Sequence, residues 1–223
     1  MTALSDRLET VRGDIADAAH RAGRDPAELT TVVVTKFQPD SLIRELAGIG
    51  VSDIGENRHQ EAAAKAQALA DLHLTWHFVG QLQTKKAKQV RRYARVIHSV
   101  DRPALVSALA SSESTIDCFV QYNLTADPER GGVASEDLEP LVERVLVTPG
   151  LHLLGVMAVA GLHEEPRSAF ARLRAVSERV RLLAPNATAI SAGMSHDFEA
   201  AIAEGATHLR IGTAITGNRP NSG

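Results

Sequence analysis

Cysteine is almost absent from this sequence, since Cys118 is the single example in 223 residues. One cysteine cannot form a disulfide within the chain, which fits a reducing compartment. Long apolar runs are absent as well, because no stretch approaches the roughly 20 apolar residues that a membrane-spanning helix needs. The first 20 residues, MTALSDRLETVRGDIADAAH, lack the unbroken apolar core of a signal peptide. We therefore expect a cytoplasmic protein in which Cys118 is buried and unreactive.

An excess of charge of one sign is also missing. The net charge is −3, the isoelectric point is about 6.3, and aromatic residues make up 4% of the chain. This composition gives no general attraction to nucleic acids or anionic membranes. The basic run KKAKQVRRYAR (85–95) places Lys85, Lys88 and Arg92 at helical spacing but contains one aromatic residue. We interpret it as a solvated helix face and expect no nucleic-acid or membrane partner; a nucleic-acid site is the alternative.

Metal-ligand patterns are lacking too. His73 and His77 lie four residues apart on a predicted strand, and HEE (163–165) lies in a predicted loop. Neither spacing matches a zinc signature, so we expect no metal site.

The sequence does contain a regular alternation of strand-like and helix-like segments. The strand-like runs lie at 30–36, 51–55, 74–80, 95–100, 116–124, 151–159, 186–191 and 207–212. The helix-like segments lie at 39–48, 57–71, 84–93, 102–112, 135–147, 165–184 and 195–204, with a short one after residue 213. This alternation predicts an α/β fold with a parallel sheet, and eight units in 223 residues favour a single closed (β/α)8 TIM barrel. The runs at 51–55 and 186–191 have the weakest strand signals, and without either of them an open sheet would be the alternative.

The barrel accounts for the whole length of the chain. Barrels of this type run to about 200–250 residues as one domain, and no segment has the composition of a linker. We therefore expect a single domain over residues 1–223. Apolar residues from Leu4 to Ala18 recur at spacings of four and three, and Gly23 is a helix stop signal, so residues 1–23 predict an extra N-terminal helix. We expect the last few residues to be flexible.

A lysine closes the first predicted strand. The run VVVTK (32–36) ends at Lys36, which shares a strand face with Val32 and Val34. Active sites of α/β barrels lie at the carboxyl ends of the strands, so an inward Lys36 would lie at the barrel mouth. A desolvated lysine has a lowered pKa and supplies a neutral amine that attacks carbonyl groups. The alternative is a strand-end charge that reaches solvent, and this residue alone does not decide between the two.

The segments after the last two predicted strands are typical of anion sites. SAGMSHDFEAAI (191–202) contains a glycine turn and a helix that we expect to begin near Ser195, with Ser195 as its N-cap. RIGTAITG (210–217) has the same layout, with Gly212 for close backbone approach and Thr213 for a hydroxyl and an N–H group. Arg210 shares a strand face with Gly212, so we expect it to point inward near the same anion. Each segment alone is an ordinary helix cap, but loops at these two places often hold phosphate in barrels.

Seven motifs occur in one order along the chain. They are VVVTK (32–36), IGENRHQE (54–61), WHFVGQLQTKK (76–86), IHSVD (97–101), LLGVMAV (153–159), GMSHDFEAAI (193–202) and RIGTAITG (210–217). Together they resemble the pyridoxal phosphate homeostasis proteins, a family related to the barrel domain of alanine racemases. The resemblance covers nearly the whole chain, and it implies a barrel with pyridoxal 5'-phosphate bound at its mouth.

The resemblance also implies roles for individual residues. Lys36 would hold the cofactor as a Schiff base, and Ser195, Gly212 and Thr213 would hold its phosphate. Arg210 matches a basic position beside the phosphate or the pyridine ring, and these two placements stay open. Asn57, His77 and Met157 would line the pocket. The chain departs from the family pattern at Arg58, at Lys85 and Lys86, at His196 and at Thr216, none of which removes the lysine or the phosphate loops.

The implied function is to bind, buffer or deliver pyridoxal phosphate within the cell, without robust catalysis. Alanine racemases use a further β domain, and the sequence ends at Gly223, so we expect no such domain here. Tyr93 and Tyr122 lack the context of a racemase base. The alternative is a weak pyridoxal-phosphate-dependent amino-acid racemase, and a Schiff-base aldolase is a third hypothesis. We expect a monomer whose partners are the cofactor and apo-enzymes that accept it.

Overall fold

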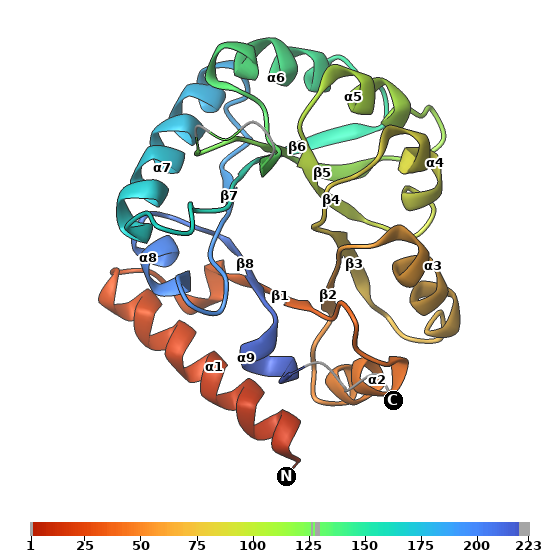
Figure 1. The fold of residues 1–223 in the computed structure, drawn as a ribbon, viewed down its shortest axis with the longest axis vertical. Helices are drawn as coiled ribbons and strands as arrows, with labels where there is room; N and C mark the ends of the chain where they lie inside the picture. Colours follow the sequence, from red (N-terminus) through yellow and green to blue (C-terminus); the bar gives the residue numbers. More distant parts are fainter. Residues whose placement is uncertain (1, 126, 128–129, 219–223) are drawn as a thin grey trace.

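The computed structural model describes residues 2–125, 127 and 130–218. Within these residues, eight parallel strands close into a barrel in chain order, and the last strand pairs with the first (Figure 1). The strands are β1 Thr30–Val34, β2 Asp53–Glu56, β3 Thr75–Phe78, β4 Val96–Val100, β5 Ile116–Gln121, β6 Leu151–Met157, β7 Ala189–Ser191 and β8 His208–Ile211. Both strands with weak sequence signals, β2 and β7, are present, so the predicted barrel is confirmed. The expected flexible C-terminal residues, 219–223, lie outside the described residues.

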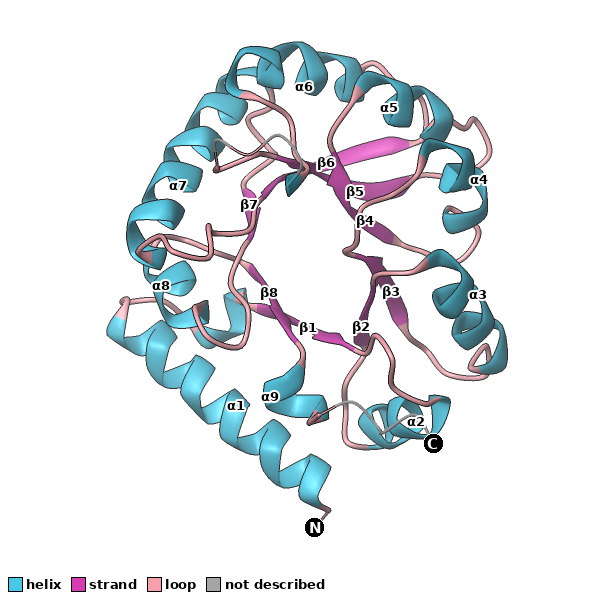
Figure 2. Cartoon of the chain, viewed as in Figure 1, coloured by secondary structure: helices cyan, strands magenta, loops and turns pink. Residues whose placement is uncertain are grey.

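Helices surround the ring of strands on its outside (Figure 2). The α-helices are α1 Ala3–Arg21, α2 Asp40–Gly48, α3 His59–Ala68, α4 Ala87–Val90, α5 Pro103–Leu109, α6 Leu138–Leu146, α7 Pro166–Leu183, α8 Phe198–Ala203 and α9 Thr213–Thr216. Short 3-10 helices occur at η1 Pro26–Glu28, η2 Thr84–Lys86 and η4 Ser135–Asp137. No helix in the described part of the chain is long and apolar enough to cross a bilayer.

One predicted helix is much shorter than expected. The segment 84–93 forms η2 and the single turn of α4, which ends at Val90. The chain then turns, and the Arg91 side chain donates hydrogen bonds to the carbonyl oxygens of Leu109 and Gly150 at 2.8 and 3.0 Å. Lys85 and Arg92 therefore lie outside α4, and the expected continuous basic helix face is wrong.

The strands are buried on both faces, as parallel strands in barrels are. Val33, Ile54 and Leu209 belong to the apolar layer that the strands share with the helices. Val96, Phe119 and Met157 form a separate apolar cluster, and register pairs Val96 with His77 and Met157 with Ser191. Cys118 of β5 is buried, as predicted, and burial raises the pKa of its thiol to about 12.

Close contact between β6 and β7 depends on one glycine. Gly155 has φ 156°, and a Cβ there would lie 1.8 Å from the carbonyl oxygen of Ala189. Any side chain at this position would push the two strands apart, so the barrel wall requires glycine here.

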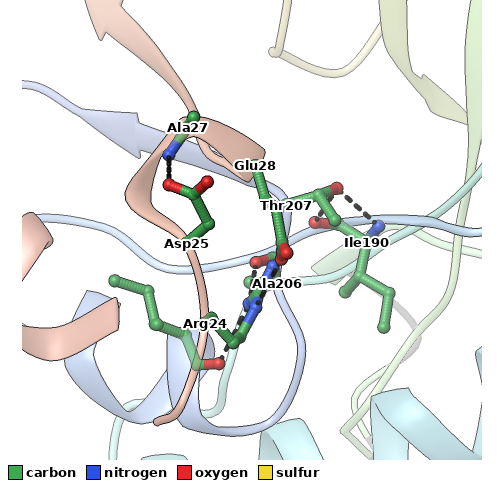
Figure 3. A network of polar contacts seen from close by, with 8 residues as sticks. Arg24, Asp25, Ala27, Glu28, Ile190, Ala206 and Thr207 are labelled. Atoms are coloured by element: carbon green, nitrogen blue, oxygen red, sulfur yellow. Dashed lines mark hydrogen bonds and ion pairs between the residues drawn. The ribbon is translucent and has the colours of Figure 1, made fainter. Parts of the chain in front are cut away.

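The N-terminal helix packs along α8 and α9 on the outside of the barrel (Figure 1). Its end is fixed by Gly23 at φ 69°, which confirms the predicted stop. The next residue, Arg24, donates to the carbonyl oxygens of Ile202 and Ala206 at 3.1 and 2.6 Å (Figure 3). Arg24 thus ties the connection between α1 and β1 to the end of α8.

Candidate functional site

A cavity of about 310 Å³ opens at the carboxyl ends of the strands. Six of the eight residues predicted for the site lie in its wall: Lys36, Asn57, Ser195, Arg210, Gly212 and Thr213. The rest of the wall is made by Val34, Val79, Val159, Met194 and His196. The wall therefore combines an apolar lining with an amine, a guanidinium and two turns, which is the usual make-up of a small-molecule site.

Lys36 lies in a turn directly after β1, where its side chain is exposed. The strand ends at Val34, two residues earlier than predicted, because the Thr35 carbonyl oxygen accepts hydrogen bonds from the Gln38 N–H and Lys65 Nζ in place of a neighbouring strand. Among the described residues, nothing forms a hydrogen bond or ion pair with the Lys36 amine. The exposed Lys36 amine reaches both the cavity and solvent, so this position is compatible with both alternatives that the sequence left open.

The residue before Lys36 is held by a buried cluster. The Thr35 hydroxyl donates to Glu56 at 2.7 Å, and the Lys65 ammonium donates to the Thr35 carbonyl oxygen at 2.9 Å. The same ammonium bonds Glu56 Oε1 at 2.7 Å, and both of these side chains are almost fully buried. Burial raises the pKa of Glu56, an effect that its bond to Lys65 opposes.

The residue after Lys36 is held by helix α3, which also carries Lys65. The Phe37 N–H donates to Glu61 at 2.6 Å, and Glu61 also pairs with Lys65 at 2.6 Å. Phe37 has φ 65°, a conformation that costs a bulky residue energy and persists only when its surroundings impose it. Helix α3 thus fixes the backbone on both sides of Lys36.

Arg210 enters the cavity wall from β8 and is only 5% exposed. Its Nη1 donates to Ser191 Oγ at 2.6 Å, and its Nη2 donates to the carbonyl oxygen of Ala158 at 3.0 Å. A guanidinium has five N–H donors, so three remain. Burial lowers the Arg210 pKa to about 10, an effect that Asp197 partly offsets, so the side chain stays charged at neutral pH.

Within the described residues, no carboxylate lies within ion-pair distance of Arg210. A buried charge without a partner is costly, because desolvation is not repaid by an opposite charge. An acceptor atom of a ligand would satisfy the remaining donors. Arg210 is therefore the strongest single sign that this cavity receives an anionic or acceptor-rich molecule.

The turn after β7 differs from the predicted geometry. Helix α8 begins at Phe198, and Asp197 occupies the position before it. Ser195 lies in the preceding turn, so its predicted role as N-cap is wrong. The chain bends there because Gly193 adopts φ 91° and Asp197 Oδ1 accepts the Met194 N–H at 2.6 Å. This turn still presents Ser195 to the cavity.

The turn after β8 has room that the protein does not fill. Thr213 is the first residue of α9, and its N–H has no partner within that helix. A Cβ at Gly212 would meet only Val34, at an ordinary 3.7 Å. Neighbouring atoms do not demand glycine here, and Gly212 leaves open space in the cavity wall.

Asn57 follows β2 and is half-buried in the cavity wall. Its Oδ1 is buried and has no hydrogen-bond partner in the described structure. Gly80 permits this placement, since a Cβ there would lie 2.3 Å from the Asn57 carbonyl oxygen. An unsatisfied buried acceptor in the same cavity wall as Lys36 favours a ligand that brings a donor.

Two residues expected in the pocket lie elsewhere. His77 is 2% exposed, and its ring bonds His98 and Asp53 at 2.9 Å each. Met157 is 1% exposed and packs with Phe119 in the interior cluster. Both lie on the predicted strands, but they lie among interior side chains and not in the described cavity wall. The prediction that His77 and Met157 line the pocket is therefore wrong for the described cavity.

The cavity wall also contains His196, which the motifs marked only as a departure from the family pattern, and three residues that they did not single out. His196 and Met194 lie in the turn after β7, and Val79 and Val159 follow β3 and β6. Their common signal is their position just beyond a strand's carboxyl end, which is where barrel loops meet.

The described residues contain no group of three or more histidine, cysteine, aspartate or glutamate side chains that could hold a metal ion. His152 is exposed and bonds Asp117 at 2.8 Å.

Comparison with known proteins gives one consistent family. The model of the alanine racemase N-terminal domain matches residues 18–220. The chain is 38% identical over 226 residues to the pyridoxal phosphate homeostasis protein of Pseudomonas aeruginosa, covering 98% of this chain and 97% of that protein. It is 34% identical over 232 residues to the protein of the same name in Escherichia coli K12, covering 100% and 99%.

Solved structures agree with these relatives. PipY of Synechococcus elongatus PCC7942, determined with PLP bound, is 32% identical with a TM-score of 0.79, over 90% of this chain and 99% of that one. Alanine racemase from Corynebacterium glutamicum is 16% identical with a TM-score of 0.69, over 97% of this chain and 62% of that one. The second likeness is one of fold alone.

Proposed function

This chain belongs to the pyridoxal phosphate homeostasis proteins, and we propose that it binds pyridoxal 5'-phosphate and holds it for supply to other proteins. One observation carries this function. The accessible amine of Lys36 and the buried guanidinium of Arg210, which has no ion-pair partner among the described residues, lie in the wall of the same cavity. Amine, cation and turn N–H groups together suit a small molecule with a carbonyl and a phosphate.

The residues present fit this cofactor. Pyridoxal phosphate brings an aldehyde that reacts with amines and a phosphate that needs hydrogen-bond donors. Lys36 supplies the amine for covalent attachment, and α3 fixes the turn that carries it. Ser195, Gly212 and Thr213 supply the turns that hold the phosphate. Arg210 donates to an acceptor, either a phosphate oxygen or the ring nitrogen.

Asn57 completes the polar wall. Its buried Oδ1 accepts a hydrogen bond from the bound molecule, which removes the one unsatisfied acceptor of this wall in the described residues. The apolar residues Val34, Val79 and Val159 would limit the access of water to the bound molecule.

We propose holding and not turnover as the activity. Racemisation needs an acid/base group on each face of the reacting carbon. Tyr93 is not in the described cavity wall. Its hydroxyl lies 3.4 Å from His59 Nδ1. Tyr122 is not in that wall either; it lines a second cavity, which shares Val159 with the first. The described wall contains three ionisable side chains: Lys36, Arg210 and His196. The His196 side chain is exposed.

Binding tests the proposal directly. Titration of the purified protein with pyridoxal phosphate, followed by visible absorbance, is expected to show saturable binding at one site. Lys36→Met should abolish the absorbance change, whereas Lys88→Met, which removes an exposed lysine of α4, should leave it unchanged. Equal binding by both variants would contradict a site at Lys36.

Delivery is tested with an acceptor. Loaded protein is mixed with an apo-form of a pyridoxal-phosphate enzyme, and recovery of that enzyme's activity is followed. We expect recovery, because Lys36 is exposed at the barrel mouth. Alanine racemisation by the loaded protein that is lost in both Lys36→Met and His196→Gln would instead establish the weak racemase.

A further inference from the structure

Five polar side chains form a continuous line of hydrogen bonds inside the barrel. Arg210 bonds Ser191 at 2.6 Å, and Ser191 bonds His98 Nδ1 at 2.8 Å. His98 Nε2 bonds His77 Nδ1 at 2.9 Å, and His77 Nε2 bonds Asp53 Oδ1 at 2.9 Å. We call these five side chains the interior file. It connects the cavity wall at Arg210 to Asp53, the first residue of β2, at the opposite ends of the strands.

The hydrogen positions in the interior file follow from Arg210. Arginine has only donors, so Ser191 Oγ must accept from it. The Ser191 hydroxyl hydrogen then points to His98 Nδ1, which accepts it. His98 therefore carries its hydrogen on Nε2 and donates to His77, which in turn donates from Nε2 to Asp53.

The reverse direction is less favourable. A hydrogen on His98 Nδ1 would leave the Ser191 hydroxyl without an acceptor among the described residues. It would also require a hydrogen on both nitrogens of His77, which would make that ring a buried cation. When each hydrogen bond of the interior file points from Arg210 toward Asp53, every donor has an acceptor and both imidazoles are neutral.

Burial makes this arrangement rigid. Ser191 and His98 are 0% exposed, and His77 is 2% exposed. Desolvation, together with the nearby charge of Arg210, lowers the pKa of His98 well below its usual value, so this ring is neutral. Phe119 stacks on His98 with ring centroids 4.7 Å apart and restricts rotation of the imidazole.

We propose that His98 is a positioning residue for Arg210, acting through Ser191. His98 Nδ1 accepts a hydrogen bond from the Ser191 hydroxyl, and this directs the serine lone pairs toward Arg210 Nη1. The Ala158 carbonyl fixes Nη2 at the same time. The guanidinium is thereby locked in one orientation, in which its three remaining N–H groups serve the cavity. The consequence for ligand affinity rests on the function proposed above, whereas the orientation of the file does not.

The first test needs no ligand. Nitrogen-15 NMR of histidine side chains distinguishes the two neutral tautomers and the doubly protonated ring. We expect His98 and His77 in the Nε2–H form at neutral pH in the ligand-free protein. Arg210→Met should shift the His98 ring signals and leave those of exposed His152 unchanged. An Nδ1–H form of His98, or a doubly protonated His77, would overturn the proposal.

The second test measures coupling. His98→Phe keeps a ring but removes both nitrogens, and we expect it to weaken pyridoxal phosphate binding about tenfold, the effect of one hydrogen bond to a charged group. In an Arg210→Lys background, His98→Phe should have no further effect, because its action passes through the guanidinium. Effects that multiply in the double variant would overturn the proposal.

Matched variants separate positioning from packing. His208 is a second interior ring that packs on Phe119, but it bonds Thr207 and no member of the interior file. His208→Phe should therefore leave the affinity for pyridoxal phosphate unchanged. His98→Gln, which retains an acceptor and a donor, should restore part of the affinity and serves if His98→Phe does not fold. Failure of the unaltered protein to bind would count against the proposed function, and the NMR result would still decide the role of His98.

Discussion

The Lys65 ammonium on α3 donates to the carbonyl oxygen of Thr35 at 2.9 Å, one residue before Lys36. It also pairs with Glu56 at 2.7 Å in a buried position, where the two side chains are 6% and 1% exposed. The placement of the Lys36 amine therefore depends on a buried ion pair whose two residues are not part of the described cavity wall.

Loss of Lys65 is expected to be costly. Lys65→Met leaves Glu56 buried without its partner, and breaking a buried pair in this way typically costs about 3–5 kcal/mol of unfolding free energy. Urea denaturation measures the loss. Arg44→Met is the control, because the Arg44–Asp71 pair is exposed and should contribute less than about 1 kcal/mol. Similar small losses in both variants would show that the buried pair does not stabilise the turn.

Gly212 is predicted to serve the ligand and not the fold. Gly212→Ala adds a methyl group that meets Val34 at 3.7 Å, so thermal stability should change little. The same methyl group occupies space beside the predicted phosphate position, so affinity for pyridoxal phosphate should fall at least about tenfold, the effect of one lost charge-assisted hydrogen bond. Gly13→Ala, at a position with no atom within 4 Å, should leave binding unchanged. Unchanged affinity in Gly212→Ala would contradict the placement of the phosphate.

Much of the site could be predicted because barrel sites gather residues that follow strands. Lys36, Gly212 and Thr213 each lie within two residues of a strand end, so a correct strand order was enough to bring them together. Strand periodicity gives the face of a residue but not its depth along the barrel. The resemblance placed His77 in the pocket, whereas in the structure its ring lies deeper in the barrel, bonded to His98 and Asp53.

Other parts of the site depend on contacts that no local pattern contains. Lys65 and Glu61 are four residues apart, a spacing that predicts a helix-surface pair. Their third partner, Glu56, belongs to β2, and only the fold turns this pair into a clamp on Thr35. Similarly, Ser191 and His98 are 93 positions apart and meet only when the barrel closes.

Stability is predicted to fall with acid. Burial lowers the pKa of His208 to about 4 and lowers that of His98 well below its usual value, whereas both titrate near 6.5 when unfolded. Below about pH 6.5 the unfolded chain therefore binds protons that the folded protein does not, and this favours unfolding. For His208 the loss proceeds from about pH 6.5 down to about 4, at no more than about 1.4 kcal/mol per pH unit.

Urea midpoints measured between pH 8 and pH 4 test this dependence. His208→Gln should make the slope shallower, since it removes one of the two groups. Comparison of this variant with the unaltered protein separates the contribution of His208 from that of Glu56. Burial raises the pKa of Glu56, so its effect on stability changes with pH in the opposite direction. A midpoint that stays constant between pH 7 and pH 5 would contradict the neutral, buried state of these rings.

The attachment of pyridoxal phosphate to Lys36 is the central claim. The direct measurement is reduction of the loaded protein with borohydride, followed by proteolysis and mass spectrometry of the labelled peptide. We predict one pyridoxyl label per chain, on the peptide that contains Lys36, and no label in Lys36→Met. A label on Lys65, Lys85 or another lysine of the unaltered protein, or no label after saturation, would contradict the account.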